Sequence, residues 1–60
     1  MIEVTKQKFE FYLEKNCDGS IFNIFKDDDR VDYHWYKGDN LIASKTVMIG
    51  ETRRIYKVKI

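Results

Sequence analysis

Apolar and polar residues alternate over residues 31–35, at the start of the stretch VDYHWYKGDNLIASKTV, residues 31–47. Alternation with a period of two is typical of a β-strand that buries one face. Gly38 and Asp39 interrupt the pattern, and a glycine in a two-residue break between such runs favours a tight hairpin turn. The pattern therefore predicts two antiparallel strands, with Asp32 opposite Lys45.

The register of this hairpin decides which side chains share a face. A two-residue turn places Trp35 opposite Ile42, and a three-residue loop at 50–52 places Ser44 opposite Val58 on a further strand. A two-residue turn at Gly50 is rejected, because it would turn lysines of the last strand toward the core. The face expected to be buried carries Val31, Tyr33, Trp35, Ile42, Met48, Tyr56, Val58 and Ile60.

Residues 5–16 fit two patterns. Read as a helix, the segment has an N-cap at Thr5 and an apolar stripe formed by Phe9, Tyr12 and Leu13. Read as a strand, it alternates over residues 9–14 and is followed by the hairpin signal Asp18-Gly19. We favour the helix, with Gly19 beyond its end. Residues 20–26 are expected to form a short strand before the acidic loop 27–29.

The expected fold is a single α+β domain over residues 1–60, in which one N-terminal helix packs on an antiparallel sheet of three to four strands. An all-β, five-stranded small barrel is the alternative. A chain of 60 residues buries only about 60% of the surface that its unfolded form exposes. The free energy of unfolding of such a domain is expected to be small.

Composition narrows the class of protein. Hydrophobic residues make up 43% and charged residues 35%, which is typical of a folded domain and not of a disordered one. The net charge of +1 gives no overall attraction for polyanions. One cysteine cannot form an internal disulfide, and no signal-peptide pattern opens the chain, so a cytoplasmic location is expected. No apolar run approaches the roughly 18 residues of a membrane-spanning helix.

Residues that could carry catalysis are few. Cys17 is the one strong nucleophile and His34 the one histidine, but one lies in a turn and the other within a strand. The acidic run 27–29 with Asp32 lacks the spacing and glycine of a calcium loop. We therefore expect no enzyme, no metal and no cofactor.

Binding is the better supported class of function. With one helix for two sheet faces, the face opposite the core is expected to be open to a partner protein or to a second copy of the chain. The candidate partner-binding residues are His34, Tyr36, Leu41, Ala43, Val47 and Ile55. If the N-terminal segment or residues 20–26 folded over this face as in a barrel, these side chains would instead be internal.

Nucleic acid is the alternative partner. Basic residues gather on the last strands, near the rings of His34 and Tyr36, and this mixture suits sequence-tolerant single-strand binding. The near-zero net charge argues against it, and basic side chains also protect edge strands from aggregation. The residues concerned are Lys45, Arg53, Arg54, Lys57 and Lys59.

Two segments resemble a known group of sequences. VTKQKFEFYL at 4–13 and YHWYKGDNLIAS at 33–44 are similar to short reading frames of tailed bacteriophages, in which a VTKxxF helix start precedes a tryptophan-containing hairpin. The chain departs from them in lacking a proline-containing connection. The resemblance implies an accessory protein that binds and inhibits a host protein in the host cytoplasm. It assigns no functional residues.

Overall fold

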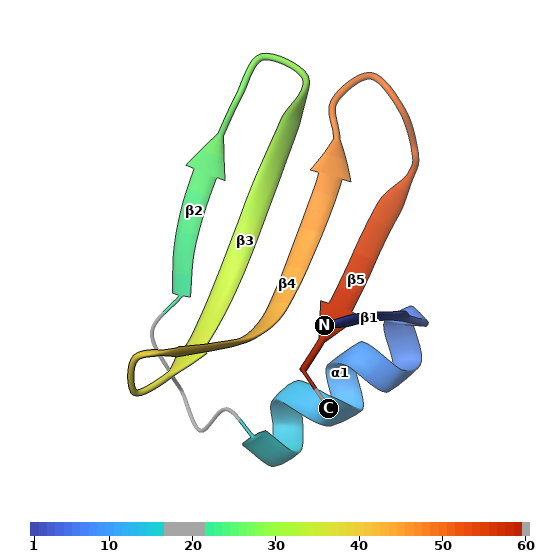
Figure 1. Ribbon diagram of the computed structural model, residues 1–60. Helices are drawn as coiled ribbons and strands as arrows, with labels where there is room; N and C mark the ends of the chain where they lie inside the picture. Colours follow the sequence, from blue (N-terminus) through green and yellow to red (C-terminus); the bar gives the residue numbers. More distant parts are fainter. Residues whose placement is uncertain (17–21, 60) are drawn as a thin grey trace.

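The structure is a computed structural model that describes residues 1–16 and 22–59. It contains one helix and five strands (Figure 1). In chain order the elements are β1 (Ile2–Val4), α1 (Lys6–Asn16), β2 (Phe22–Lys26), β3 (Arg30–Lys37), β4 (Asn40–Met48) and β5 (Arg54–Val58).

The strands form one open, antiparallel sheet in the order β1-β5-β4-β3-β2. Strands β2 to β5 follow one another as a meander, and β1 closes the other edge by pairing Ile2 with Val58. The prediction of one helix packed on an antiparallel sheet is confirmed. The sheet has five strands, however, and not the three to four that were predicted. Strand β1 was missed because three residues are too few to display a period. The open edges distinguish this sheet from the alternative closed barrel.

Helix α1 begins directly after Thr5, which is its N-cap, as predicted. The Thr5 hydroxyl accepts a hydrogen bond from the Lys8 backbone N–H at 3.2 Å, and its carbonyl accepts one from the Phe9 N–H at 2.9 Å. The first bond satisfies one of the backbone donors that every helix start leaves free, and the second is the first regular hydrogen bond of the helix. The expected stop at Gly19, like Cys17, lies outside the described residues.

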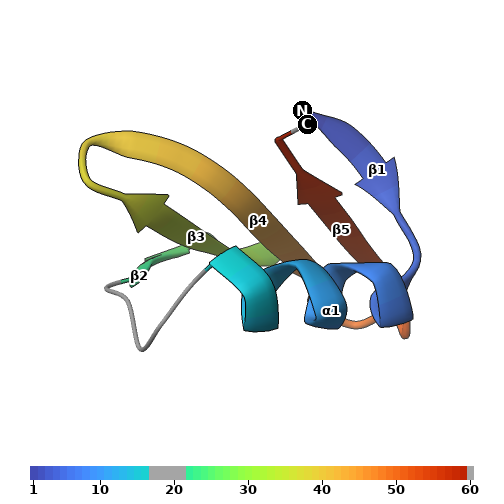
Figure 2. The same ribbon diagram turned by 90° about the horizontal axis from the view of Figure 1, so that it is seen from below.

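Helix α1 lies on one side of the sheet, against β5 and beside β1 (Figure 2). Phe9 is the centre of the contact: its ring centroid lies 5.3 Å from that of Trp35 and 5.0 Å from that of Tyr56. The Tyr12 hydroxyl donates a hydrogen bond to the Lys59 carbonyl at 2.8 Å. The buried cluster is small and consists, among the described residues, of Phe9, Ile42, Ala43 and Val58, with Val4, Tyr12, Leu13, Trp35 and Tyr56 packed against it.

The β3–β4 hairpin contains a β-bulge that the sequence pattern did not reveal. The predicted two-residue turn is present: Lys37 pairs with Asn40, and Gly38 has a φ of 63°. Between Trp35 and Tyr36, however, the register shifts by one residue, so that Trp35 pairs with Ala43 and Ile42 is the extra residue. A one-residue shift moves every following side chain of β4 to the other face.

Several predicted pairs are therefore wrong. Asp32 lies opposite Thr46, whose hydroxyl donates to the Asp32 carboxylate at 2.5 Å. Lys45 lies opposite Tyr33 instead, with its ammonium 5.5 Å from the centroid of that ring. The next loop spans residues 49–52, one residue more than predicted, because the Met48 N–H donates to the Arg53 carbonyl at 3.3 Å.

Register and alternation together define two faces of the sheet. We call the side that carries α1 the helix face and the opposite side the open face. The helix face carries Ile2, Val4, Ile24, Lys26, Val31, Tyr33, Trp35, Ala43, Lys45, Val47, Arg54, Tyr56 and Val58. The open face carries Glu3, Asn23, Phe25, Arg30, Asp32, His34, Tyr36, Leu41, Ser44, Thr46, Met48, Ile55 and Lys57. Met48 therefore lies on the open face, contrary to prediction.

Candidate functional site on the open face

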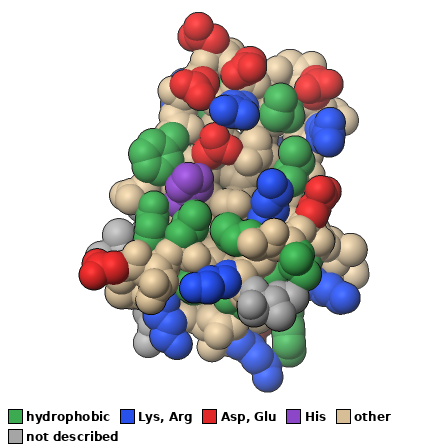
Figure 3. Space-filling model, viewed as in Figure 1, with side chains coloured by type: hydrophobic (Ala, Val, Ile, Leu, Met, Phe, Trp, Pro, Cys, Tyr) green, Lys and Arg blue, Asp and Glu red, His purple; other side chains and the backbone are tan. Residues whose placement is uncertain are grey.

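Three rings form a row on the open face. Phe25 of β2 lies 4.9 Å from His34 of β3, between ring centroids, and His34 lies 6.5 Å from Tyr36. His34 and Tyr36 share a face because they are two residues apart in one strand, and Phe25 joins them through the regular β2–β3 register. In Figure 3, the histidine (purple) is flanked by hydrophobic side chains (green).

Leu41 extends this row onto β4. It lies opposite Tyr36, on the hairpin side of the bulge, where the predicted register still holds. His34, Tyr36 and Leu41 are half-buried by their neighbours, whereas Phe25 is 50% exposed. We call Phe25, His34, Tyr36 and Leu41 the aromatic patch. It presents large apolar surfaces on the side of the sheet that α1 does not cover.

The six predicted partner-binding residues do not all lie on the open face. His34, Tyr36, Leu41 and Ile55 lie on the open face, as predicted. Ala43 and Val47 do not: Ala43 is 0% exposed in the core, and Val47 lies opposite Val31 on the helix face.

Ile55 lies opposite Thr46. Because Ser44 and Thr46 of β4 lie between β3 and β5 on this face, Ile55 is separated from the aromatic patch.

Phe25 is the member that sequence reasoning missed. Its strand has the consecutive apolar residues Ile24 and Phe25, so no pattern within the strand distinguished an inward from an outward side. The register settles this, because Phe25 lies opposite Asp32 and Ile24 lies opposite Tyr33. The sequence did hold one signal for it. Phe25 is a large hydrophobic residue close to the predicted turn 27–29, and the strand after this turn carries His34, so the two side chains could be expected to lie near each other.

Charged side chains at one end of the patch are paired with one another. The Arg30 Nε lies 3.7 Å from an Asp27 carboxylate oxygen and 3.6 Å from one of Asp32. The Asp27 N–H donates to the Arg30 carbonyl at 2.9 Å, which closes the β2–β3 turn. The side chains of Arg30 and Asp27 are largely exposed, so this ion pair contributes little to stability, whereas Asp32 is 22% exposed. The acidic run belongs to a hydrogen-bonded turn, and the described residues contain no group of three or more side chains suited to a metal ion.

The five basic residues of the nucleic-acid hypothesis do not share a surface. Lys45 lies on the helix face, with its ammonium 5.5 Å from the ring centroid of Tyr33 and 6.0 Å from that of Tyr56. Arg54, opposite Val47, also lies on the helix face. Lys57 lies on the open face, paired with Ser44. The expected cluster of cations is divided between the two sides of the sheet.

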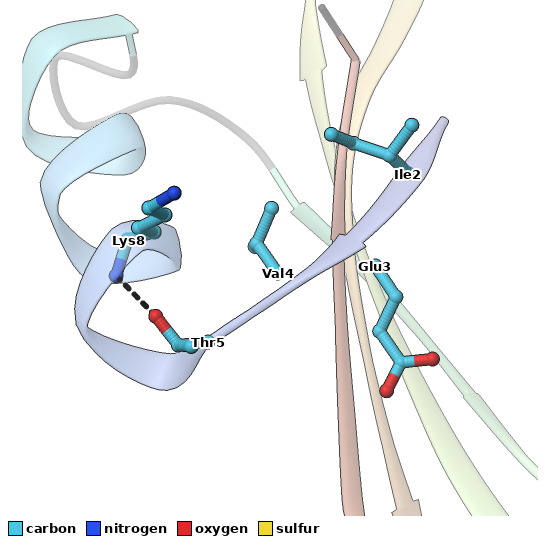
Figure 4. Close-up of a pocket in the computed structure, with 5 residues that line it drawn as sticks. All are labelled: Ile2, Glu3, Val4, Thr5 and Lys8. Carbon is cyan, nitrogen blue, oxygen red and sulfur yellow. Dashed lines mark hydrogen bonds between the residues drawn. The ribbon is translucent and has the colours of Figure 1, made fainter.

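Two hollows lie near β1, away from the aromatic patch. The hollow of about 560 Å³ in Figure 4 is lined by Ile2, Glu3, Val4, Thr5 and Lys8, and Glu3 points to the opposite side of the strand from Val4. The second, of about 360 Å³, is lined by Ile2, Val4, Lys8, Phe11, Tyr12, Lys15, Asn16 and Val58. His34 lines neither hollow.

Helix α1 has 11 residues, and none of the described helical segments is long and apolar enough to cross a membrane. No protein-family model, curated protein or solved structure matches this chain.

Proposed function

We propose that this chain is a small, non-enzymatic protein-binding module that captures its partner on the aromatic patch. The observation that carries the proposal is the row Phe25, His34 and Tyr36 with Leu41 beside it, on the sheet face that the helix leaves open. Aromatic side chains of this kind are enriched at the centres of protein interfaces, where they combine large apolar area with few rotatable bonds.

The surroundings of the patch support a protein as the partner. On one side the patch is bordered by hydroxyl groups of Ser44 and Thr46, and near Phe25 by the paired charges of Arg30 and Asp32. An apolar centre with a polar rim is the usual composition of a protein–protein interface. The complementary surface would present apolar side chains to the rings.

The resemblance to phage reading frames suggests which proteins to test. A host protein whose activity is blocked when the aromatic patch covers it fits an accessory protein of infection. Inhibition then requires only occupancy of a surface that the host protein needs, and no catalytic group on this chain.

The test is capture from a bacterial extract, followed by measurement with the purified partner. The double variant Tyr36→Ser and Leu41→Ser removes the largest half-buried part of the patch, and the expected result is at least about a thirtyfold loss of affinity, as for an interface hot spot. Isothermal titration calorimetry gives the affinity, and an activity assay of the captured protein tests inhibition.

The matched control is Phe11→Ser, which removes an exposed ring from α1, a ring that is 59% exposed. Capture should survive this change. Circular dichroism must show that the double variant is folded. A folded double variant that binds as well as the unchanged chain would overturn the proposal, and an unfolded one would show that Tyr36 and Leu41 are structural.

Single-stranded nucleic acid is the rival proposal, and its support is weaker. It needs a continuous track of cations beside stacking rings. Here Lys45 and Arg54 are separated from His34 and Tyr36 by the sheet itself.

A further inference from the structure

Strand β2 is an outer edge of the sheet, with β3 as its neighbour (Figure 1). Two consecutive hydrophobic residues are largely exposed there: Ile24 is 55% exposed on the helix face, and Phe25 is 50% exposed on the open face. An edge strand also presents alternate backbone N–H and C=O groups that no neighbour satisfies. The β2 edge is therefore apolar on both faces and able to form hydrogen bonds along its length.

The usual protections of an edge strand are missing from β2. All five of its residues pair in regular register with β3, so no bulge bends the strand away, and the chain has no proline. Its one charge, Lys26, stands at the last position. The opposite edge, β1, has only three residues with Glu3 in the middle. A short strand with a central charge is a protected edge, and a regular apolar one is a site for strand addition.

We propose that two copies of this chain associate by antiparallel pairing of β2 with β2 of the second copy, about a two-fold axis at Ile24. In this register Ile24 lies opposite Ile24 of the second copy, and Asn23 lies opposite Phe25 of the second copy. Both exposed hydrophobic side chains are then covered in part by the neighbouring strand.

Charge and symmetry favour a second copy paired in this way. Parallel pairing in register would set the two Lys26 ammonium groups side by side, whereas antiparallel pairing places them at opposite ends of the strands. Ile24 is the middle residue of β2, so a two-fold axis there uses the whole strand. The antiparallel arrangement of the sheet then continues from β2 of one copy to β2 of the second copy.

The size of the contact sets its strength. Five residues on each side form a small interface compared with the roughly 1,200 Å² of a standard stable one, so the dimer is weak and depends on concentration. A two-fold axis perpendicular to the sheet keeps both open faces on the same side. Dimerisation would thus align two aromatic patches and would cover in part only Phe25 of each, leaving His34, Tyr36 and Leu41 open.

The experiment is sedimentation velocity of the unchanged chain from micromolar to millimolar concentration. A monomer–dimer equilibrium is expected. Ile24→Lys and Ile24→Glu each place like charges at the axis and should raise the dissociation constant by at least about tenfold. An equimolar mixture of the two variants should restore dimers, because the opposite charges then meet.

Two controls separate β2 pairing from other associations. Ile49→Lys adds the same charge at an exposed hydrophobic position in the β4–β5 loop and should leave the dimer unchanged. The double variant Tyr36→Ser and Leu41→Ser should also stay dimeric, whatever it does to partner capture. Circular dichroism checks that each variant is folded.

A chain that stays monomeric at millimolar concentration would overturn the proposal. So would a dimer that survives Ile24→Lys, a mixture of the two Ile24 variants that fails to associate, or a dimer lost only when the aromatic patch is changed. Amide hydrogen exchange gives an independent reading: β2 amides should become more protected as concentration rises.

Discussion

Replacing Phe9 with alanine tests the central packing contact of the fold. Phe9 is 3% exposed, contacts the rings of Trp35 and Tyr56, and belongs to a buried cluster with Ile42, Ala43 and Val58. Because this cluster is so small, removal of its one aromatic member leaves α1 with little buried area against the sheet.

The expected loss follows from the buried area. A buried phenylalanine removes on the order of 150–200 Å² from water, and at about 25 cal/mol per Å² this corresponds to about 4–5 kcal/mol. Alanine returns roughly 0.5 kcal/mol through its higher helix propensity. The net expectation is a decrease of about 3.5–4.5 kcal/mol in the free energy of unfolding. A domain of this length has a total of roughly 3–9 kcal/mol, so the variant should be at the limit of folding.

Urea denaturation followed by the fluorescence of Trp35, the one tryptophan, measures this loss, because Trp35 contacts Phe9. If the alanine variant is unfolded, Phe9→Leu should still show an unfolding transition in urea. Its free energy of unfolding is expected to be lower by about 1–2 kcal/mol.

Phe11→Ala is the matched control, since it makes the same substitution in the same helix at a ring that is 59% exposed. Its loss of a contact with the Lys15 ammonium, 5.0 Å from the ring centroid, is offset by helix propensity. The expected change is within about 0.5 kcal/mol.

Equal losses of stability in Phe9→Ala and Phe11→Ala would refute the packing argument. A loss below about 1 kcal/mol at Phe9 would do the same, because the buried area assigned to it would then not be buried in solution.

Three other predictions test the register, the helix start and the choice of partner. Ala43→Glu should unfold the domain, because it places an unpaired carboxylate in the core. Ser44→Glu, on the open face, should change the stability by less than about 1 kcal/mol. Thermal unfolding measures both, and a less stable Ser44→Glu than Ala43→Glu would contradict the bulge. Thr5→Ala should cost about 1 kcal/mol through loss of the hydrogen bond to the Lys8 N–H, seen as a lower melting temperature, while Thr52→Ala in a loop should have little effect. No binding to a labelled single-stranded oligonucleotide is expected by fluorescence anisotropy even at low salt; binding that weakens steeply with added salt would favour the nucleic-acid proposal instead.

The sequence was most informative where local rules act alone. Thr5 as an N-cap and the stripe Phe9, Tyr12 and Leu13 predicted α1 and the side of it that packs, because capping and helical periodicity depend on a few neighbouring residues. Gly38 predicted the turn of the hairpin for the same reason, since its positive φ is a local requirement.

The faces of β4 beyond Ile42 could not be predicted in the same way, whereas those of β5 were predicted correctly, because the one extra residue in the loop 49–52 offsets the bulge. Leu41, Ile42 and Ala43 are three consecutive apolar residues, and nothing in the sequence shows that one of them is extra. Ile42 and Ala43 both belong to the buried cluster, and burying two consecutive residues of one strand requires the bulge. That requirement arises from packing against Phe9 and Val58, which lie far away in sequence. The expected face is therefore confirmed for His34, Tyr36 and Leu41 and is wrong beyond the bulge in β4, at Ala43 and Val47; that the open-face residues bind a partner stays a prediction.

The pairing of the first strand with the last has a practical consequence. Because Ile2 lies opposite Val58, the chain enters and leaves the sheet at the same place, at the edge opposite β2. A domain with neighbouring ends can be inserted as a unit into a surface loop of a carrier protein, since the loop is not pulled apart. Mounted this way, the domain would hold its apolar edge and its ring-bearing surface away from the carrier.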